Sequence, residues 1–80
     1  MLRGSRKNIV GRRIAEARGH FQPKLTQDDL SGRLARAGIQ LDRAAIAKIE
    51  RNHRRVLDYE LKALAEALGV RAEWLLGGAR

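Results

Sequence analysis

Residues that begin or end helices divide this chain into short segments, and no segment shows the alternation of apolar and polar residues that marks a β-strand. Within the segments, apolar residues recur at the spacing that places them on one face of a helix. We expect five helices, at about 9–18, 27–37, 43–51, 59–68 and 71–76. The predicted fold class is therefore all-α, a compact bundle of five short helices around one core.

Capping residues support these boundaries. A side-chain oxygen at the start of a helix can accept a hydrogen bond from a free backbone N–H group. The expected capping residues are Asn8, Thr26, Asp42 and Asp58. Residues that tolerate the left-handed conformation are suited to end a helix. The expected helix ends of this kind are Gly38, Asn52 and Gly69.

The composition supports a single small domain. The chain has 80 residues, of which 44% are hydrophobic, enough for one modest core, and it shows no internal repeat or linker. We expect the domain to span residues 8–77, after a basic, flexible N-terminal arm of residues 1–7 and before a tail of residues 78–80. The lack of cysteine indicates a reducing compartment, and no apolar run approaches the roughly 18 residues of a membrane span. We expect a cytoplasmic protein.

Positive charge is concentrated in two segments. The formal net charge is +8. Six basic residues accompany one acidic residue in 1–18, and five accompany one in 43–55, whereas 56–80 hold three basic and four acidic residues. This uneven distribution indicates one electropositive face and a polyanionic partner. We therefore expect a nucleic-acid partner.

The predicted helix at 43–51 has an unusual outer face. With about 100° between successive residues, Ile46 and Ile49 fall together on the core side. The residues on the outward side are Arg43, Ala44, Ala47, Lys48 and Arg51. Small residues between cations allow close approach to another surface, and the major groove of DNA admits such a helix. A solvated helix in an alanine-rich sequence is the alternative interpretation.

Further cations follow this helix. Together with Arg51 they are His53, Arg54 and Arg55. They suit contacts with phosphates, which fix the register of a protein on the duplex. Thr26, at the start of the second helix, lies where free backbone N–H groups can also bind a phosphate oxygen.

From Val10 to about Leu76 the chain resembles the helix-turn-helix domain of the phage repressor and Cro class, often called the XRE family. The motifs that carry the resemblance are VGRRIAEAR, LTQDDLSGRL, AIAKIERNHR, LKALAEALGV and WLL. The resemblance implies sequence-specific binding to double-stranded DNA by a transcriptional regulator, a repressor, that places helix 43–52 in the major groove.

The resemblance also implies roles for single residues. The matching base-contacting positions are Arg43, Ala44, Ala47 and Lys48, and the matching phosphate-contacting positions are Gln27, Arg51 and His53. Gln27 would also brace the recognition helix. The family's matching glutamate, here Glu50, pairs with an arginine late in the first helix, here Arg18, which would keep guanidinium donors for a phosphate. The alternative is a contact of Glu50 with Arg54, four residues along the helix.

The chain departs from the family pattern before the third helix. Counted from Gln27, Ile46 lies several residues later than usual, and the additional residues fall in ARAGIQLD. Either the second helix is longer or the turn is wider, and this choice affects the tilt of the third helix.

Other function classes have weaker support. His20 and His53 are far apart, no cysteine is present, and Ser5 and Ser31 have no catalytic setting. We therefore expect no enzyme, no metal and no cofactor. RNA binding is an alternative, although the usual stacking aromatics are missing, because Tyr59 and Trp74 lie outside the basic segments.

A protein partner is a further alternative, since an antitoxin-type regulator or one part of a larger regulator would bind a protein as well as DNA. We expect Trp74 to close the core, and Leu75 or Leu76 to contact a second copy in a homodimer on a two-fold operator.

Overall fold

The computed structural model describes the backbone of residues 2–78 and the side chains of residues 9–78. Within these residues the chain forms five helices and no strand, which confirms the predicted all-α class. The helices are α1 (Leu2–Gly19), α2 (Gln27–Arg36), α3 (Arg43–Glu50), α4 (Asp58–Leu68) and α5 (Ala72–Leu75). Met1, Ala79 and Arg80, which belong to the expected arm and tail, lie outside the described residues.

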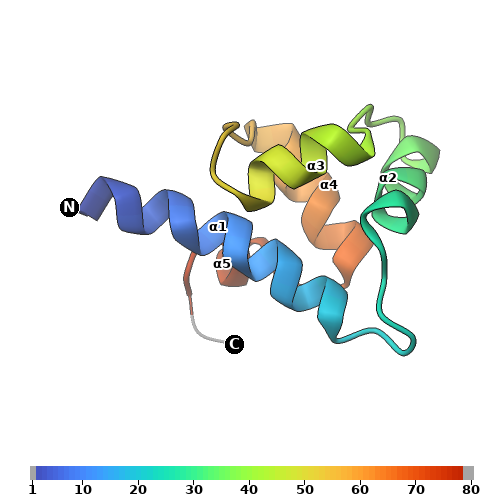
Figure 1. Ribbon diagram of the computed structural model, residues 1–80, viewed down its shortest axis with the longest axis horizontal. Coiled ribbons are helices and arrows are strands. Elements are labelled where there is room, and N and C mark those ends of the chain that lie inside the picture. The colour runs from blue at the N-terminus through green and yellow to red at the C-terminus, as the bar shows by residue number, and fades with distance from the viewer. Residues whose placement is uncertain (1, 79–80) are drawn as a thin grey trace.

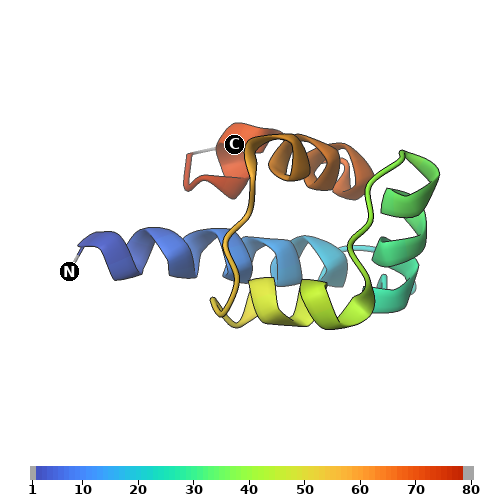
Figure 2. The same ribbon diagram turned by 90° about the horizontal axis from the view of Figure 1, so that it is seen from above.

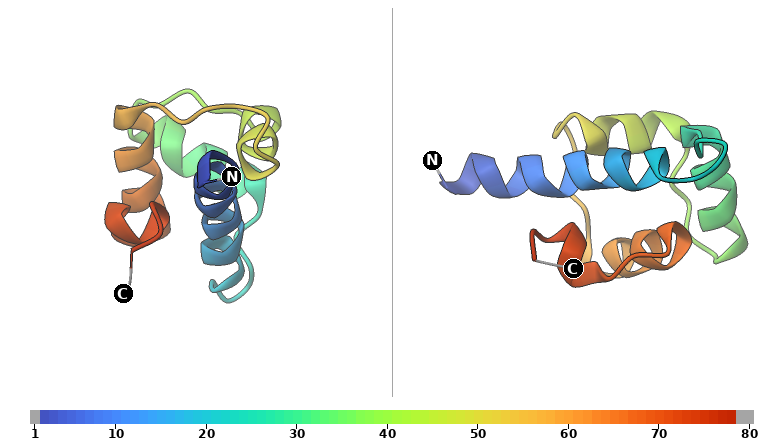
Figure 3. Two further views of the ribbon diagram at one scale, coloured as in Figure 1. Left: turned by 90° about the vertical axis from the view of Figure 1, so that its left-hand side faces the viewer. Right: turned by 90° about the horizontal axis from the view of Figure 1, so that it is seen from below.

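The helices form two layers joined at one end. Helices α1 and α3 lie side by side in one layer, α4 and α5 form the other, and α2 closes one end (Figures 2 and 3). The segments that follow α2 and α3 cross between the layers (Figure 2). Helix α3 therefore lies at the surface, supported by α1 and α2 (Figure 1).

Helix α1 is longer than predicted. The expected start at Ile9 with Asn8 as its cap is wrong, because the helix begins at Leu2 and includes residues assigned to the arm. Its N-terminal end projects beyond the other helices (Figure 1). A segment with Leu2 as its one apolar residue has no apolar stripe from which to predict a helix. No proline interrupts it, and extending an existing helix is easier than starting one.

The predicted caps of α2 and α3 are confirmed. The hydroxyl of Thr26 accepts from the backbone N–H of Asp29 at 3.0 Å, and the Asp29 carboxylate accepts from the N–H of Thr26 at 3.1 Å. The carboxylate of Asp42 accepts from the N–H of Ala45 at 2.8 Å. Both caps satisfy N–H groups that have no partner inside the helix.

The predicted cap of α4 is wrong by one residue. Leu57 has the extended backbone of the capping position, and Asp58 is the first helical residue. The side chain of Glu60 reaches back and accepts from the Leu57 N–H at 3.0 Å. A carboxylate at the third helical position can make this bond whatever residue stands at the cap.

Helix α3 ends at Glu50, slightly earlier than predicted, and Asn52 takes the left-handed conformation expected of it, with φ at 64°. The N–H of His53 donates to the Lys48 carbonyl at 2.7 Å, and that of Asn52 donates to the Ile49 carbonyl at 3.0 Å. This Schellman pattern fixes the direction in which the chain leaves α3.

The additional residues before α3 form a wider turn rather than a longer helix. Helix α2 ends at Arg36, and Gly38 has the expected positive φ, 86°. The turn continues to Asp42, and Leu41 within it is 2% exposed, so the turn is anchored in the core.

The core contains the apolar stripe of each helix. Ile46 and Ile49, predicted on the core side of α3, are buried. The buried apolar residues of the other long helices are Ile14, Ala17, Leu30, Leu34, Leu64, Ala65 and Leu68. Leu61 on α4 is half-buried. Trp74 is buried, as expected for a residue that closes the core.

Candidate nucleic-acid interface

Helix α3 presents the outer face that its sequence predicts. Ile46 and Ile49 are 1% and 2% exposed and hold the helix on the core. Of the four predicted base-contacting residues, Arg43, Ala44 and Lys48 are exposed, and Ala47 is half-buried. The guanidinium of Arg43 lies 3.9 Å from the carboxylate of Asp28, with both side chains largely exposed. Such an exposed pair holds the arginine only weakly.

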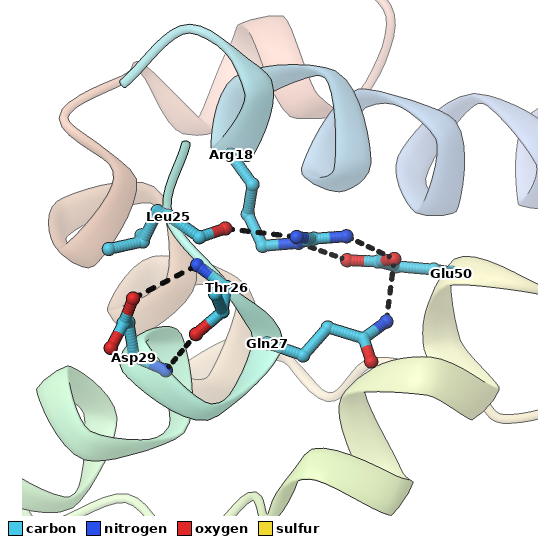
Figure 4. Close-up of polar contacts among 6 residues, drawn as sticks. All are labelled: Arg18, Leu25, Thr26, Gln27, Asp29 and Glu50. Atoms are coloured by element: carbon cyan, nitrogen blue, oxygen red, sulfur yellow. Dashed lines mark hydrogen bonds and ion pairs between the residues drawn. The ribbon is translucent and has the colours of Figure 1, made fainter. Parts of the chain in front are cut away.

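A buried network joins α3 to the two helices beside it (Figure 4). Arg18 Nε donates to Glu50 Oε2 at 2.8 Å, and Arg18 Nη2 donates to Glu50 Oε1 at 2.9 Å. The amide of Gln27, on the first turn of α2, donates to Glu50 Oε1 at 3.0 Å. Glu50 therefore receives one partner from α1 and one from α2, and the predicted pairing with Arg18 is present.

The surroundings of Arg18 bear on the phosphate contact implied for it. Arg18 is 8% exposed, and its Nη1 donates to the Leu25 carbonyl at 2.9 Å (Figure 4). Each nitrogen of the guanidinium therefore has a partner inside the protein. Both terminal nitrogens carry a second N–H group, so a contact with phosphate stays a prediction. Burial of a charged pair is tolerated when its remaining groups are hydrogen-bonded in this way.

Gly11 brings α1 into direct contact with the end of α3. A Cβ atom at this position would lie 2.5 Å from the Ile49 carbonyl oxygen and 2.9 Å from that of Glu50. Both distances are shorter than any real contact of a Cβ atom, so only glycine fits this crossing. The position of α3 against α1 thus depends on the absence of a side chain at Gly11.

The basic residues that follow α3 differ in their surroundings. Arg51, His53 and Arg55 are exposed. Arg54 instead donates from Nη1 and Nη2 to the carboxylate of Glu60 at 3.0 and 3.1 Å. This contact excludes Arg54 as the partner of Glu50, the alternative left open by the sequence.

The hydrogen bonds between Arg54 and Glu60 shift both groups toward their charged forms. The Arg54 guanidinium holds the pKa of the Glu60 carboxyl below its usual value, although burial opposes the shift. The same hydrogen bonds raise the pKa of Arg54. The pair is therefore ionised over the physiological range.

The start of α2 is occupied by its capping box. The side-chain oxygen and backbone N–H of Thr26 both bond to Asp29, within the capping box. Asp28 and Asp29 are exposed beside it, so two acids stand at this helix end. The hydrogen bonds of Thr26 belong to the cap in this structure, and Gln27 is joined to Glu50.

Sequence reasoning missed two residues that shape this surface, Gly11 and Glu60. A glycine inside a helical segment often has a packing reason, and that signal is visible in VGRRIAEAR. The signal for Glu60 is an acid at the third position of a predicted helix. Neither signal indicates which atoms Gly11 or Glu60 contacts in the folded protein.

The C-terminal end separates the two leucines proposed for dimer contact. Leu75 is 0% exposed, so it belongs to the core and not to a dimer surface, whereas Leu76 is 57% exposed. Arg13 fixes this end, because its guanidinium lies over the Trp74 ring and donates to the Trp74 carbonyl at 2.7 Å. In the described part of the chain, no helix has the length and apolar character to cross a membrane.

Comparison with known proteins identifies one family. No curated protein and no solved structure matches the chain. The family described as "Helix-turn-helix domain" matches residues 11–80, which is most of the chain and includes α2, the wide turn and α3. The chain therefore belongs to the helix-turn-helix domain family.

Proposed function

We propose that this protein is a transcriptional regulator of the phage repressor and Cro type that binds a specific sequence of double-stranded DNA in the cytoplasm. The observation that carries the proposal is the outer face of α3, where Ala44 and Ala47 lie between the exposed cations Arg43 and Lys48. The helix enters the major groove with this face, so the family assignment and the geometry support the same partner.

The side chains on this face suit direct reading of bases. Arg43 and Lys48 can donate to guanine O6 and N7, and the methyl groups of Ala44 and Ala47 can contact thymine. The ion pair of Arg43 with Asp28 is long and exposed. A base would therefore compete with only a weak internal partner at Arg43.

Phosphate contacts position this helix on the duplex. The exposed basic residues that follow α3 lie at its far end and are Arg51, His53 and Arg55. Gln27 is half-buried beside Glu50 and braces α3. Thr26 stays a candidate phosphate contact because it stands at the start of α2. Asp28 and Asp29 reduce the attraction of that helix start for phosphate.

A homodimer would extend the proposal to a two-fold operator. Leu76 is the exposed apolar residue at the C-terminal end, and burial of it in a partner would remove apolar surface from water. Two copies would then read half-sites one helical turn apart, roughly 34–36 Å. Leu57 and Tyr59, 49% and 61% exposed, offer apolar surface for a different protein partner, as an antitoxin-type regulator would need.

Titration with duplex DNA at several salt concentrations tests the proposal. If about five phosphates are neutralised per subunit, log K falls with log salt with a slope near −4 to −5. A structured RNA of equal length and charge is the matched competitor. Equal affinity for the two nucleic acids would contradict DNA recognition through α3, since the deep major groove of RNA excludes a helix.

A further inference from the structure

The first turn of α4 contains a buried acid that DNA binding by itself would not favour. Glu60 is 4% exposed, in a protein with a net charge of +8, and it follows the segment that holds the proposed phosphate contacts. An acid at such a place repels phosphate and also loses hydration when it is buried. Its presence therefore indicates a role that outweighs both costs.

The carboxylate of Glu60 holds the C-terminal end of segment 51–57, which connects α3 to α4. It accepts two hydrogen bonds from the guanidinium of Arg54 and one from the N–H of Leu57, at 3.0 to 3.1 Å. Arg54 Nη1 also donates to the carbonyl of Arg55 at 2.8 Å. The backbone of the segment is thus tied to one side chain on α4 at two places, at Leu57 directly and at Arg55 through Arg54.

The other end of the segment is tied to α3. The Schellman bonds of Asn52 and His53 fix the first residues after the helix, as described above. Arg51, His53 and Arg55 lie along this segment, and their side chains are exposed. The conformation of the segment, and hence the direction of these basic side chains, depends on both ends being held.

Arg54 differs from its neighbours. Its side chain is 33% exposed, and both terminal nitrogens bond inside the protein in the parallel arrangement that an arginine makes with a carboxylate. A residue that only contacts phosphate needs positive charge and reach, which lysine also has. The observed contacts need the planar guanidinium.

We propose that Arg54 and Glu60 are positioning residues for DNA binding, which hold the segment 51–57 so that Arg51, His53 and Arg55 meet the phosphate backbone. This inference rests on the proposed function. Under this proposal Arg54 does not contact phosphate itself but supports the residues beside it. Glu60, although negatively charged, is then necessary for binding DNA.

The direction in which one substitution changes the affinity for DNA tests this inference. Replacing Glu60 by Gln removes a negative charge, which by electrostatics alone should strengthen DNA binding. We expect the opposite, a roughly tenfold loss of affinity, equivalent to about 1.4 kcal/mol. The matched control is Glu66→Gln on the same helix, an exposed acid, for which unchanged or slightly tighter binding is expected. If Glu60→Gln binds DNA as tightly as the natural protein or more tightly, the inference is overturned.

A second variant keeps the test decisive if Glu60→Gln does not fold, as judged by circular dichroism. Arg54→Lys keeps the charge but cannot make the parallel pair of bonds, so we expect a similar loss of affinity with an unchanged salt slope. Arg36→Lys, on the exposed surface of α2, is its control. If Arg54→Lys binds DNA with the same affinity as the natural protein, the inference is overturned, because a simple phosphate contact tolerates lysine.

Amide hydrogen exchange separates failure of this inference from failure of the proposed function. The Leu57 N–H should exchange faster in Arg54→Lys than in the natural protein, with no DNA present. If the natural protein shows no preference for duplex DNA, the proposed function fails, and with it the role assigned to the pair in binding. Unchanged exchange of the Leu57 N–H in Arg54→Lys contradicts the inference even when the natural protein binds DNA.

Discussion

The guanidinium of Arg18 and the carboxylate of Glu50 form a two-bond ion pair, 2.8 and 2.9 Å long, that joins α1 to the end of α3. Both side chains are about one-tenth exposed. Since Gln27 adds a bond from α2 to the same carboxylate, the orientation of α3 depends on one acid.

Replacing Glu50 by Ala should leave the buried guanidinium of Arg18 without its charged partner. We expect a loss of about 3 kcal/mol in the free energy of unfolding, because an unpaired buried charge is costly. Urea denaturation measures the loss, and Glu66→Ala, which removes an exposed acid, is the control. A loss below about 1 kcal/mol, typical of an exposed pair, would show that the network is not a brace.

Gly11→Ala should destabilise the protein and alter the crossing of α1 and α3, since the added Cβ would lie 2.5 Å from a backbone oxygen. Gly32 offers a matched control, because it lies in α2 and a Cβ there meets no atom within 4 Å. Alanine at Gly32 should stabilise the helix by roughly 0.5–1 kcal/mol. Thermal denaturation of the two variants should therefore give shifts of opposite sign, and a stabilising Gly11→Ala would rule out the close crossing.

Low pH should reduce the free energy of unfolding through protonation of Glu60. Its pKa in the folded protein is lowered, so its contribution to stability is complete above the unfolded value of about 4.3 and disappears as the pH falls through the folded value. Unfolding free energies of the natural protein and Glu60→Gln should converge only as the pH falls through the lowered pKa of Glu60 in the folded protein. Asp29, whose pKa is also lowered, is present in both and cancels in the difference. A difference that does not change with pH would contradict the assignment.

Leu76→Ser should disrupt the proposed dimer without affecting the fold, because Leu76 is largely exposed. Analytical ultracentrifugation with a two-half-site duplex should show two copies of the natural protein and one of the variant at the same concentration. Leu57→Ser is the control for loss of an exposed leucine. If the natural protein occupies DNA strictly as a monomer, the dimer proposal fails.

Features that depend on neighbouring residues were predictable from the sequence. The hydroxyl of Thr26 and the carboxylate of Asp42 reach N–H groups three residues ahead, and the spacing of Ile46 and Ile49 places both on the core side. The Arg18–Glu50 pair spans a long stretch of sequence and came from the family resemblance, not from periodicity.

Other features depend on how distant segments meet. The close approach at Gly11 requires knowledge of the α1–α3 crossing, and the partner of Arg54 requires knowledge of the path after Asn52. Helix α5 has four residues, too few for a periodic pattern to separate buried Leu75 from exposed Leu76. The extension of α1 lacks the apolar stripe that marks other helices.

Selection of bound sequences from a random duplex pool, made with the natural protein and with Lys48→Ala, tests the central claim most directly. We predict an enriched motif for the natural protein and a relaxed preference at one or two positions of that motif for the variant, because Lys48 is exposed on the proposed reading face of α3. No enriched motif, or an identical motif for both proteins, would contradict sequence reading by this helix.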